Sequence, residues 1–124
     1  MRIAATVSAD GTQILPLALG PTVRILDTET NQTEEYPNPG FQAPAHPRRL
    51  TVDSLPQHRI DVLAAVPNSV CGGSQGRARM AGIRFLLLPA GATWADLTEK
   101  AAEANLTDEV PAELRFSHGP GHAC

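Results

Sequence analysis

The residues best suited to chemistry lie in one short loop, Asn68 to Ser74, where Cys71 is followed by Gly72 and Gly73. Adjacent glycines allow a ligand to approach the backbone closely. A helix predicted at 75–81 would direct N–H groups and a partial positive charge at the loop, which favours an anion. A thiol at such a position has a lowered pKa and becomes a better ligand for soft metals. The loop therefore predicts a site for a soft, anionic ligand.

Arg77 is expected to face this loop and to add positive charge to it. The alternative is that the two glycines serve only a tight strand-to-helix turn, and that Cys71 is a small buried apolar residue. The sequence leaves both interpretations open. The predicted cofactor-binding residues are Ser69, Cys71, Gly72, Gly73, Ser74 and Arg77.

The C-terminal segment offers a second ligand set, with His118, His122 and Cys124 within seven residues of one another. Two imidazoles and a thiolate suit Zn, Cu or Fe, and the intervening glycines would let the chain wrap around an ion. The spacing matches no zinc-finger motif. The alternative is a mobile tail that binds metal only adventitiously.

The remaining titratable residues give no catalytic prediction. His46 and His58 are expected at the surface. A two-metal nuclease would need Asp10, Asp27 and Asp61 to converge, but these fall in a turn and at opposite strand ends. The sequence contains no nucleophile elbow, phosphate-binding loop or dinucleotide-binding glycine pattern.

Short apolar runs separated by turn residues predict the elements that position these loops. The run from Asp61 to Val66 lacks polar alternation, which is typical of a strand covered on both faces. Thr93, with Asp96 three residues later, forms a capping box that predicts a helix start. Expected strands cover 2–7, 13–17, 22–28, 33–36, 61–66 and 83–88, and expected helices cover 48–57, 75–81 and 94–104.

The 124-residue chain is expected to form one domain with an aliphatic core, because 42% of its residues are hydrophobic but only 4% are aromatic. The net charge of −3, with no basic run longer than Arg48-Arg49, argues against a nucleic-acid partner. No apolar run approaches the ~20 residues that cross a bilayer and no signal peptide is evident, so we expect a cytoplasmic protein without membrane contact. Cys71 and Cys124 do not make a disulfide framework, and each is expected to be a free thiol or a metal ligand.

Several short segments occur in a characteristic order: Met1–Ala4, Gly20, Ile25–Thr30, Arg59–Leu63, Gly72–Gly73, Ala81–Arg84 and Pro89–Thr93. Their order and spacing resemble the dinitrogenase iron–molybdenum cofactor biosynthesis family of small cofactor-carrier domains. The resemblance implies a ribonuclease H-like, three-layer α/β domain at 1–105 with a mixed sheet of about five strands, followed by a tail at 106–124. A subgroup of that family, the orange proteins of sulfate reducers, is similar in size and holds a molybdenum–copper sulfide cluster without dedicated covalent ligands.

The resemblance implies non-catalytic binding or carriage of a metal–sulfur cofactor containing Mo, Fe or Cu, or of its precursor, with donor and acceptor proteins as partners. The loops at 18–21, 37–47 and 68–74 are expected to form the mouth of the site. Many family members carry His-Phe-Gly before the third strand, whereas this chain has Ala18-Leu19-Gly20, so a histidine ligand is not carried over. The alternatives are a regulatory or assembly module that binds a protein without metal, and a nuclease-type enzyme on the same fold.

Overall fold

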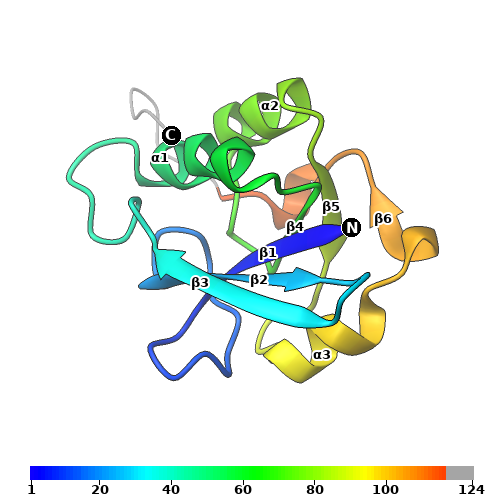
Figure 1. The fold of residues 1–124 in the computed structure, drawn as a ribbon. Helices are drawn as coiled ribbons and strands as arrows, with labels where there is room; N and C mark the ends of the chain where they lie inside the picture. Colours follow the sequence, from blue (N-terminus) through cyan, green and yellow to red (C-terminus); the bar gives the residue numbers. More distant parts are fainter. Residues whose placement is uncertain (117–124) are drawn as a thin grey trace.

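A mixed six-stranded sheet with the order β3-β2-β1-β4-β5-β6 forms the centre of the molecule (Figure 1). A computed structural model describes residues 1–116 of the chain. The strands are β1 (Arg2–Val7), β2 (Thr22–Asp27), β3 (Gln32–Pro37), β4 (Val62–Ala65), β5 (Arg84–Leu87) and β6 (Leu106–Thr107). The helices are α1 (Pro47–Ser54), α2 (Gly72–Met80) and α3 (Trp94–Lys100), with short 3₁₀ turns η1 (Leu55–His58), η2 (Glu103–Asn105) and η3 (Ala112–Leu114).

The strand directions confirm the expected α/β class with a mixed sheet. β1, β2 and β3 are antiparallel, β1, β4 and β5 are parallel, and β6 is antiparallel to β5. The expected strand at 13–17 is wrong, since this segment forms only isolated bridges from Ile14 to Val7 and from Gln13 to Thr93. Pro16 lacks the N–H that a continuing ladder would need. The unforeseen strand β6 brings the sheet to six rather than about five strands.

The sheet lies between two helical layers. On one face α1 and α2 cover Ala4, Ile25, Leu63 and Phe85, and on the other face α3 covers Ile3, Ala5 and Val62 (Figure 1). Successive strand residues alternate between these layers because side chains of a strand point to opposite faces. All four residues of β4 are buried, as expected for a strand covered on both sides. Leu87, in the expected strand at 83–88, and Trp94, in the expected helix at 94–104, are half-buried rather than buried.

The ends of the helices follow local side-chain chemistry. Thr93 and Asp96 form the expected capping box of α3, although this helix ends at Lys100 rather than near 104. α2 begins at Gly72, three residues earlier than expected, because the Cys71 side chain caps it by accepting a hydrogen bond from the Ser74 N–H. Gly82 follows α2 with φ of 79°, the left-handed conformation expected for a glycine after a helix.

The described part of the expected tail, residues 106–116, packs onto the domain. β6 pairs with β5, and the Val110 N–H donates to Gln75 Oε1 of α2. The N–H groups of Asn68 and Phe116 bond to the carbonyls of Leu114 and Val70, so the segment also pairs with the loop after β4. The boundary expected after residue 105 therefore does not separate residues 106–116 from the rest of the domain. In the described residues, no helix combines the length and apolarity of a membrane span.

Candidate functional site

The connections that follow the parallel strands gather at one edge of the sheet. The chain leaves β1 after Val7, β4 after Ala65 and β5 after Leu87, all at the carboxyl ends of parallel strands. The connection that follows β3 starts at the same edge, because Pro37 pairs with Thr22, which pairs with Val7. The order in which strands are added to the sheet also reverses at β1, since β2 lies on one side of β1 and β4 on the other. Ligands of open α/β sheets bind outside such a switch point.

A hollow of about 440 Å³ opens at this edge. Its wall combines the loop after β1, the first turn of α1, the loop after β4 and the end of the described chain. Most of the lining is apolar, and Leu19 is 61% exposed at its side. The described residues that line it are Pro16, Ala18, Leu19, Arg48, Asn68 and Phe116. The expected mouth thus includes parts of 18–21 and 68–74, while 37–47 contributes none of these lining residues.

Arg48 supplies the positive charge of this hollow. Its guanidinium carbon lies 3.5 Å from the centroid of the Phe116 ring, as in a cation–π contact. Its Nε is buried and has no hydrogen-bond partner in the described residues. Burial lowers the pKa of Arg48, although a guanidinium remains charged at any physiological pH. A partly desolvated cation with an unused donor is a favourable partner for an anion.

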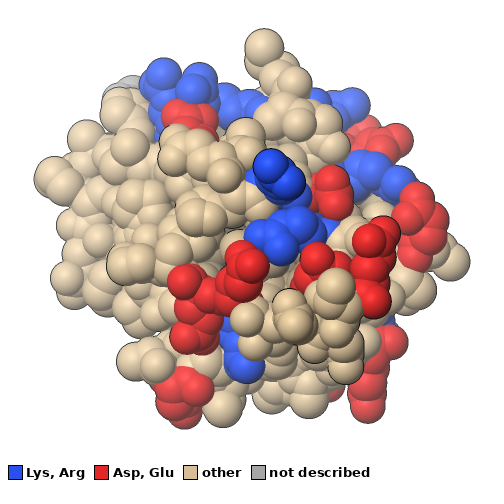
Figure 2. All heavy atoms as spheres, in the orientation of Figure 1, with Lys and Arg blue, Asp and Glu red and all other residues tan. Residues whose placement is uncertain are grey.

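Within residues 1–116, no ion pair neutralises Arg48. Segments 11–23 and 36–47, which adjoin it, contain no Asp, Glu, Lys or Arg. In Figure 2 the side of the molecule that carries the loop after β3 is nearly free of charged side chains, whereas red and blue groups mix over the centre. Ion pairs within the described residues are made by Arg2, Arg24, Arg49, Arg77 and Arg84.

Arg115 is a second guanidinium without an ion pair in the described residues. Nη1 of Arg115 is 3.6 Å from the point that a Cβ on Gly72 would occupy, so it lies beside the start of α2. A cation beside the positive end of a helix dipole is unfavourable unless an anion lies nearby. Arg48 and Arg115 thus give the loop from Asn68 to Gly72 a positive electrostatic environment.

The predicted loop residues lie at the start of α2, with Gly72, Gly73 and Ser74 inside the helix rather than before it, and the Cys71 sulfur is turned inward. Gly72 and Gly73 are exposed at the start of α2, whereas Ser69, Cys71 and Ser74 are each 1% exposed. Cys71 Sγ lies 3.0 Å from Ser74 Oγ and accepts from the Ser74 N–H. Ser69 Oγ is buried with no partner in the described residues. Cys71 is disulfide-bonded, so the expectation of a free thiol or metal ligand at this position is wrong.

Arg77 faces away from the loop, contrary to expectation. Its Nε and Nη2 each donate to a carboxylate oxygen of Asp53 on α1, both at 2.8 Å. This hydrogen bonding raises the pKa of Arg77. Position 77 lies in the second half of α2 and the helix turns its side chain toward α1, so the charge serves helix contact instead of the loop.

The other metal-ligand candidates do not assemble in the described residues. No group of three or more His, Cys, Asp or Glu side chains there could hold a metal ion. His118, His122 and Cys124 lie outside the described residues. His46 precedes α1 in a left-handed conformation, and His58 stacks on Tyr36 with ring centroids 3.8 Å apart.

The carboxylates considered for a nuclease also fail to converge. Asp27 and Asp61 lie at the same sheet edge, since β2 runs antiparallel to β1, so placing them at opposite ends is wrong. Both contact Arg2: the Arg2 N–H donates to Asp61, and Nη1 lies 3.8 Å from Asp27. Asp10 lies in the turn after β1, at the other edge.

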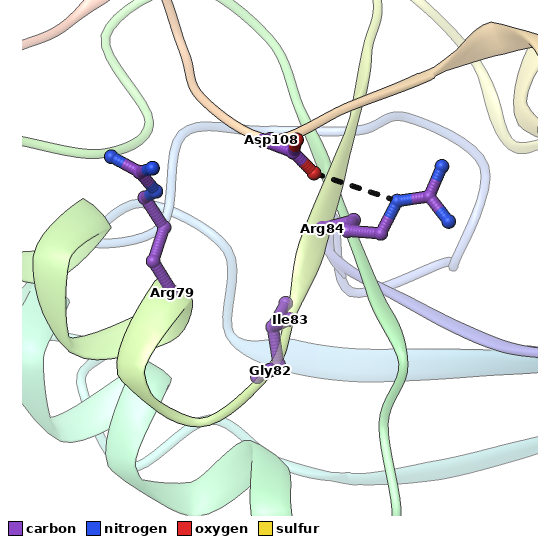
Figure 3. A pocket seen from close by; sticks show the side chains of 5 residues that line it. All are labelled: Arg79, Gly82, Ile83, Arg84 and Asp108. Atoms are coloured by element: carbon purple, nitrogen blue, oxygen red, sulfur yellow. Dashed lines mark ion pairs between the residues drawn. The ribbon is translucent and has the colours of Figure 1, made fainter.

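A second hollow of about 270 Å³ lies at the opposite edge of the sheet, between the end of α2 and the start of β5 (Figure 3). Its arginine Arg84 already pairs with acidic groups, at 2.7 Å from Glu103 and 3.8 Å from Asp108. Arg79 extends from α2 away from that pair (Figure 3). Glu103 and Asp108 therefore offset the charge of Arg84 here, whereas no carboxylate is among the described residues that line the hollow beside Arg48.

Sequence reasoning missed Arg48 and Phe116 as parts of the site, and it included Asn68 only as the first residue of the predicted loop. Arg48 has a usable signal, because it follows Pro47 at the start of a helix and directly after a long uncharged loop. Phe116 has none, because its place depends on the return of the chain to the loop after β4. The left-handed φ of 68° at Asn68 is a backbone feature that only the structure reveals.

Comparison with known proteins shows a shared fold but no family by sequence. No family model matches the chain, and no curated protein matches it significantly. The apo form of the orange protein from Desulfovibrio gigas matches with a TM-score of 0.73 at 16% identity, covering 90% of this chain and 93% of that one. A putative NifB protein from Thermotoga, of the DUF35 family, matches with a TM-score of 0.65 at 21% identity, covering 97% and 98%. The chain therefore has the fold of these two proteins over nearly its whole length.

Proposed function

We propose that this protein binds and carries an anionic metal–sulfur cofactor, of the Fe/Mo or Mo/Cu type, or its precursor, in the hollow beside Arg48. The observation that carries the proposal is the half-buried Arg48 guanidinium, which has no anionic partner in the described residues and faces a mostly apolar hollow at the switch point. The fold shared with the orange protein supports it. We also assign the three-layer arrangement to the ribonuclease H-like fold.

The chemistry of the wall suits a soft anion held without metal–protein bonds. A sulfide-rich metallate spreads its charge over large sulfur atoms and is less strongly hydrated than an oxyanion. Apolar surface from Ala18, Leu19 and Phe116 can contact such an ion, while Arg48 and the Asn68 side chain supply charge and polarity. The replacement of the family histidine by Ala18-Leu19 removes a metal ligand from this loop, so the described wall has charge and shape to provide the binding.

The lining favours carriage over catalysis. None of the described lining residues is a nucleophile or a group that exchanges protons near neutral pH. A carrier also needs to receive and deliver its cargo, so we propose a donor and an acceptor protein as partners. The exposed Leu19 at the side of the hollow is a suitable contact for them.

Anaerobic loading tests the proposal. The purified protein is incubated with tetrathiomolybdate, with and without Cu(I), or with Fe(II) and sulfide, and then desalted. We expect Mo or Fe, together with sulfide, to stay with the protein at a fixed ratio and to give a charge-transfer absorption band. A protein that retains no metal but co-purifies with one specific protein would support the metal-free assembly module instead.

A further inference from the structure

The side chain of Asn38 joins three separate segments around the hollow. Asn38 follows β3 directly and is only 6% exposed. Its Nδ2 donates to the carbonyls of Leu17 and Gly20, both at 2.8 Å. These carbonyls bracket Ala18 and Leu19, the residues that line the hollow on the side of β1. One amide group therefore holds both ends of this part of the wall.

The acceptor side of the same amide is directed at α1. Oδ1 of Asn38 accepts from Thr51 Oγ1 at 2.7 Å and from the Gly40 N–H at 3.0 Å. Thr51 lies on α1, within one turn of Arg48. Both donors and both acceptor sites of the amide are thus used, which is what a buried amide needs if its burial is not to cost stability.

Two other contacts hold this loop, one to β1 and one within the loop itself. Gly20 packs tightly on β1, since a Cβ there would lie 2.9 Å from Thr6 Cβ, and this fixes the end of the loop. Within the loop itself, Leu19 N–H donates to the Pro16 carbonyl at 2.9 Å. Among the hydrogen bonds of the described residues, those from this loop to the segment before α1 are made by Asn38, through its side chain and through its backbone N–H, which donates to the Pro21 carbonyl at 3.0 Å.

We propose that Asn38 is a positioning residue of the cofactor site, which fixes the Ala18–Leu19 wall relative to Arg48 and does not itself touch the cargo. This inference rests on the proposed function. Without the amide, Ala18 and Leu19 would have to become ordered when the cargo binds, and that entropy cost would lower the affinity. Position 38 would then control binding from behind the wall.

The test compares three variants for tetrathiomolybdate affinity and for hydrogen exchange at the Leu19 amide. Asn38→Ser removes both long-range donors, and we expect an affinity loss of about tenfold with faster exchange at Leu19. Thr51→Val keeps both donors and should stay within about threefold of wild type. Leu97→Ala opens a cavity in the opposite layer, under α3, and should change stability but neither readout.

The outcomes separate this inference from the proposed function. If wild type retains no thiomolybdate, the proposed function fails, and unchanged exchange at Leu19 in Asn38→Ser would overturn the positioning role as well. If wild type loads and Asn38→Ser binds equally well, only the positioning role is overturned. Equal losses in all three variants would mean that affinity follows global stability, which also overturns it.

Discussion

Arg48 and Arg49 are neighbours in the sequence but have different surroundings. Arg49 is exposed on α1 and its Nε lies 4.0 Å from Asp53, so its charge is screened and already paired. Arg48 stacks on Phe116, lines the hollow and keeps a buried Nε without a partner in the described residues. Replacing each arginine in turn therefore distinguishes a general effect of positive charge on α1 from a specific effect of the Arg48 guanidinium.

The lowered pKa of the Asp10 carboxylate predicts how the turn after β1 depends on pH. Hydrogen bonds from Ser8 Oγ at 2.6 Å, the Thr12 N–H at 3.1 Å and Thr12 Oγ1 at 2.8 Å lower the pKa of Asp10 from 3.8 to about 2. Because the folded pKa lies below the unfolded one, these bonds stabilise the turn above pH 3.8 and lose this effect as the pH falls through about 2. An NMR titration of the side chain should show that low midpoint, and a midpoint near 3.8 would contradict it.

At the scale of elements, α1 and α2 are joined by the ion pair of Arg77 with Asp53. Both side chains are exposed by 40% or more, so the pair is screened and should contribute little to stability. We expect Arg77→Ala to lower the melting temperature only slightly and to leave thiomolybdate loading unchanged. A strong loss of loading in a folded Arg77→Ala protein would return this arginine to the site, as the sequence first suggested.

Local signals predicted most elements, and long-range pairing accounts for those that were missed. The capping box at Thr93 and the uninterrupted apolar run of β4 are visible in a few consecutive residues, so both were predicted. β6 has only two residues and exists because Leu106 and Thr107 pair with β5. The short apolar segment at 13–17 was expected to be a strand but forms only isolated bridges. Pairing of this kind depends on the tertiary fold.

The same distinction holds for the site. The glycines after Cys71 indicated a loop before a helix, whereas the structure makes them the exposed first two residues of α2 itself. The orientations of the Cys71 and Arg77 side chains depend on their neighbours in the folded protein, such as Asp53 of α1 beside Arg77, and these neighbours cannot be identified from the sequence. Arg48 and Phe116 meet only because the end of the described chain returns across the loop after β4.

At the scale of the whole molecule, stability depends on the aliphatic layers on both faces of the sheet. Phe85, on β5, is 0% exposed and packs in the cluster that joins the sheet to α1 and α2. We expect Phe85→Ala to reduce the free energy of unfolding by about 3–5 kcal/mol, because the truncation leaves a cavity that the core cannot fill. Urea denaturation measures this difference, and a loss below about 1 kcal/mol would mean that β5 is not buried between two layers.

The central claim, that the hollow beside Arg48 holds an anionic metal–sulfur cargo, is tested most directly by loading Arg48→Ala and Arg49→Ala in parallel with wild type. Each protein is incubated anaerobically with tetrathiomolybdate and Cu(I), desalted, and analysed for Mo, Cu and sulfide, with circular dichroism as a check on folding. We predict that Arg49→Ala loads like wild type and that Arg48→Ala binds at least about tenfold more weakly, since it loses a charge-assisted contact. Equal loading of both variants, or equal loss in both, would contradict the account.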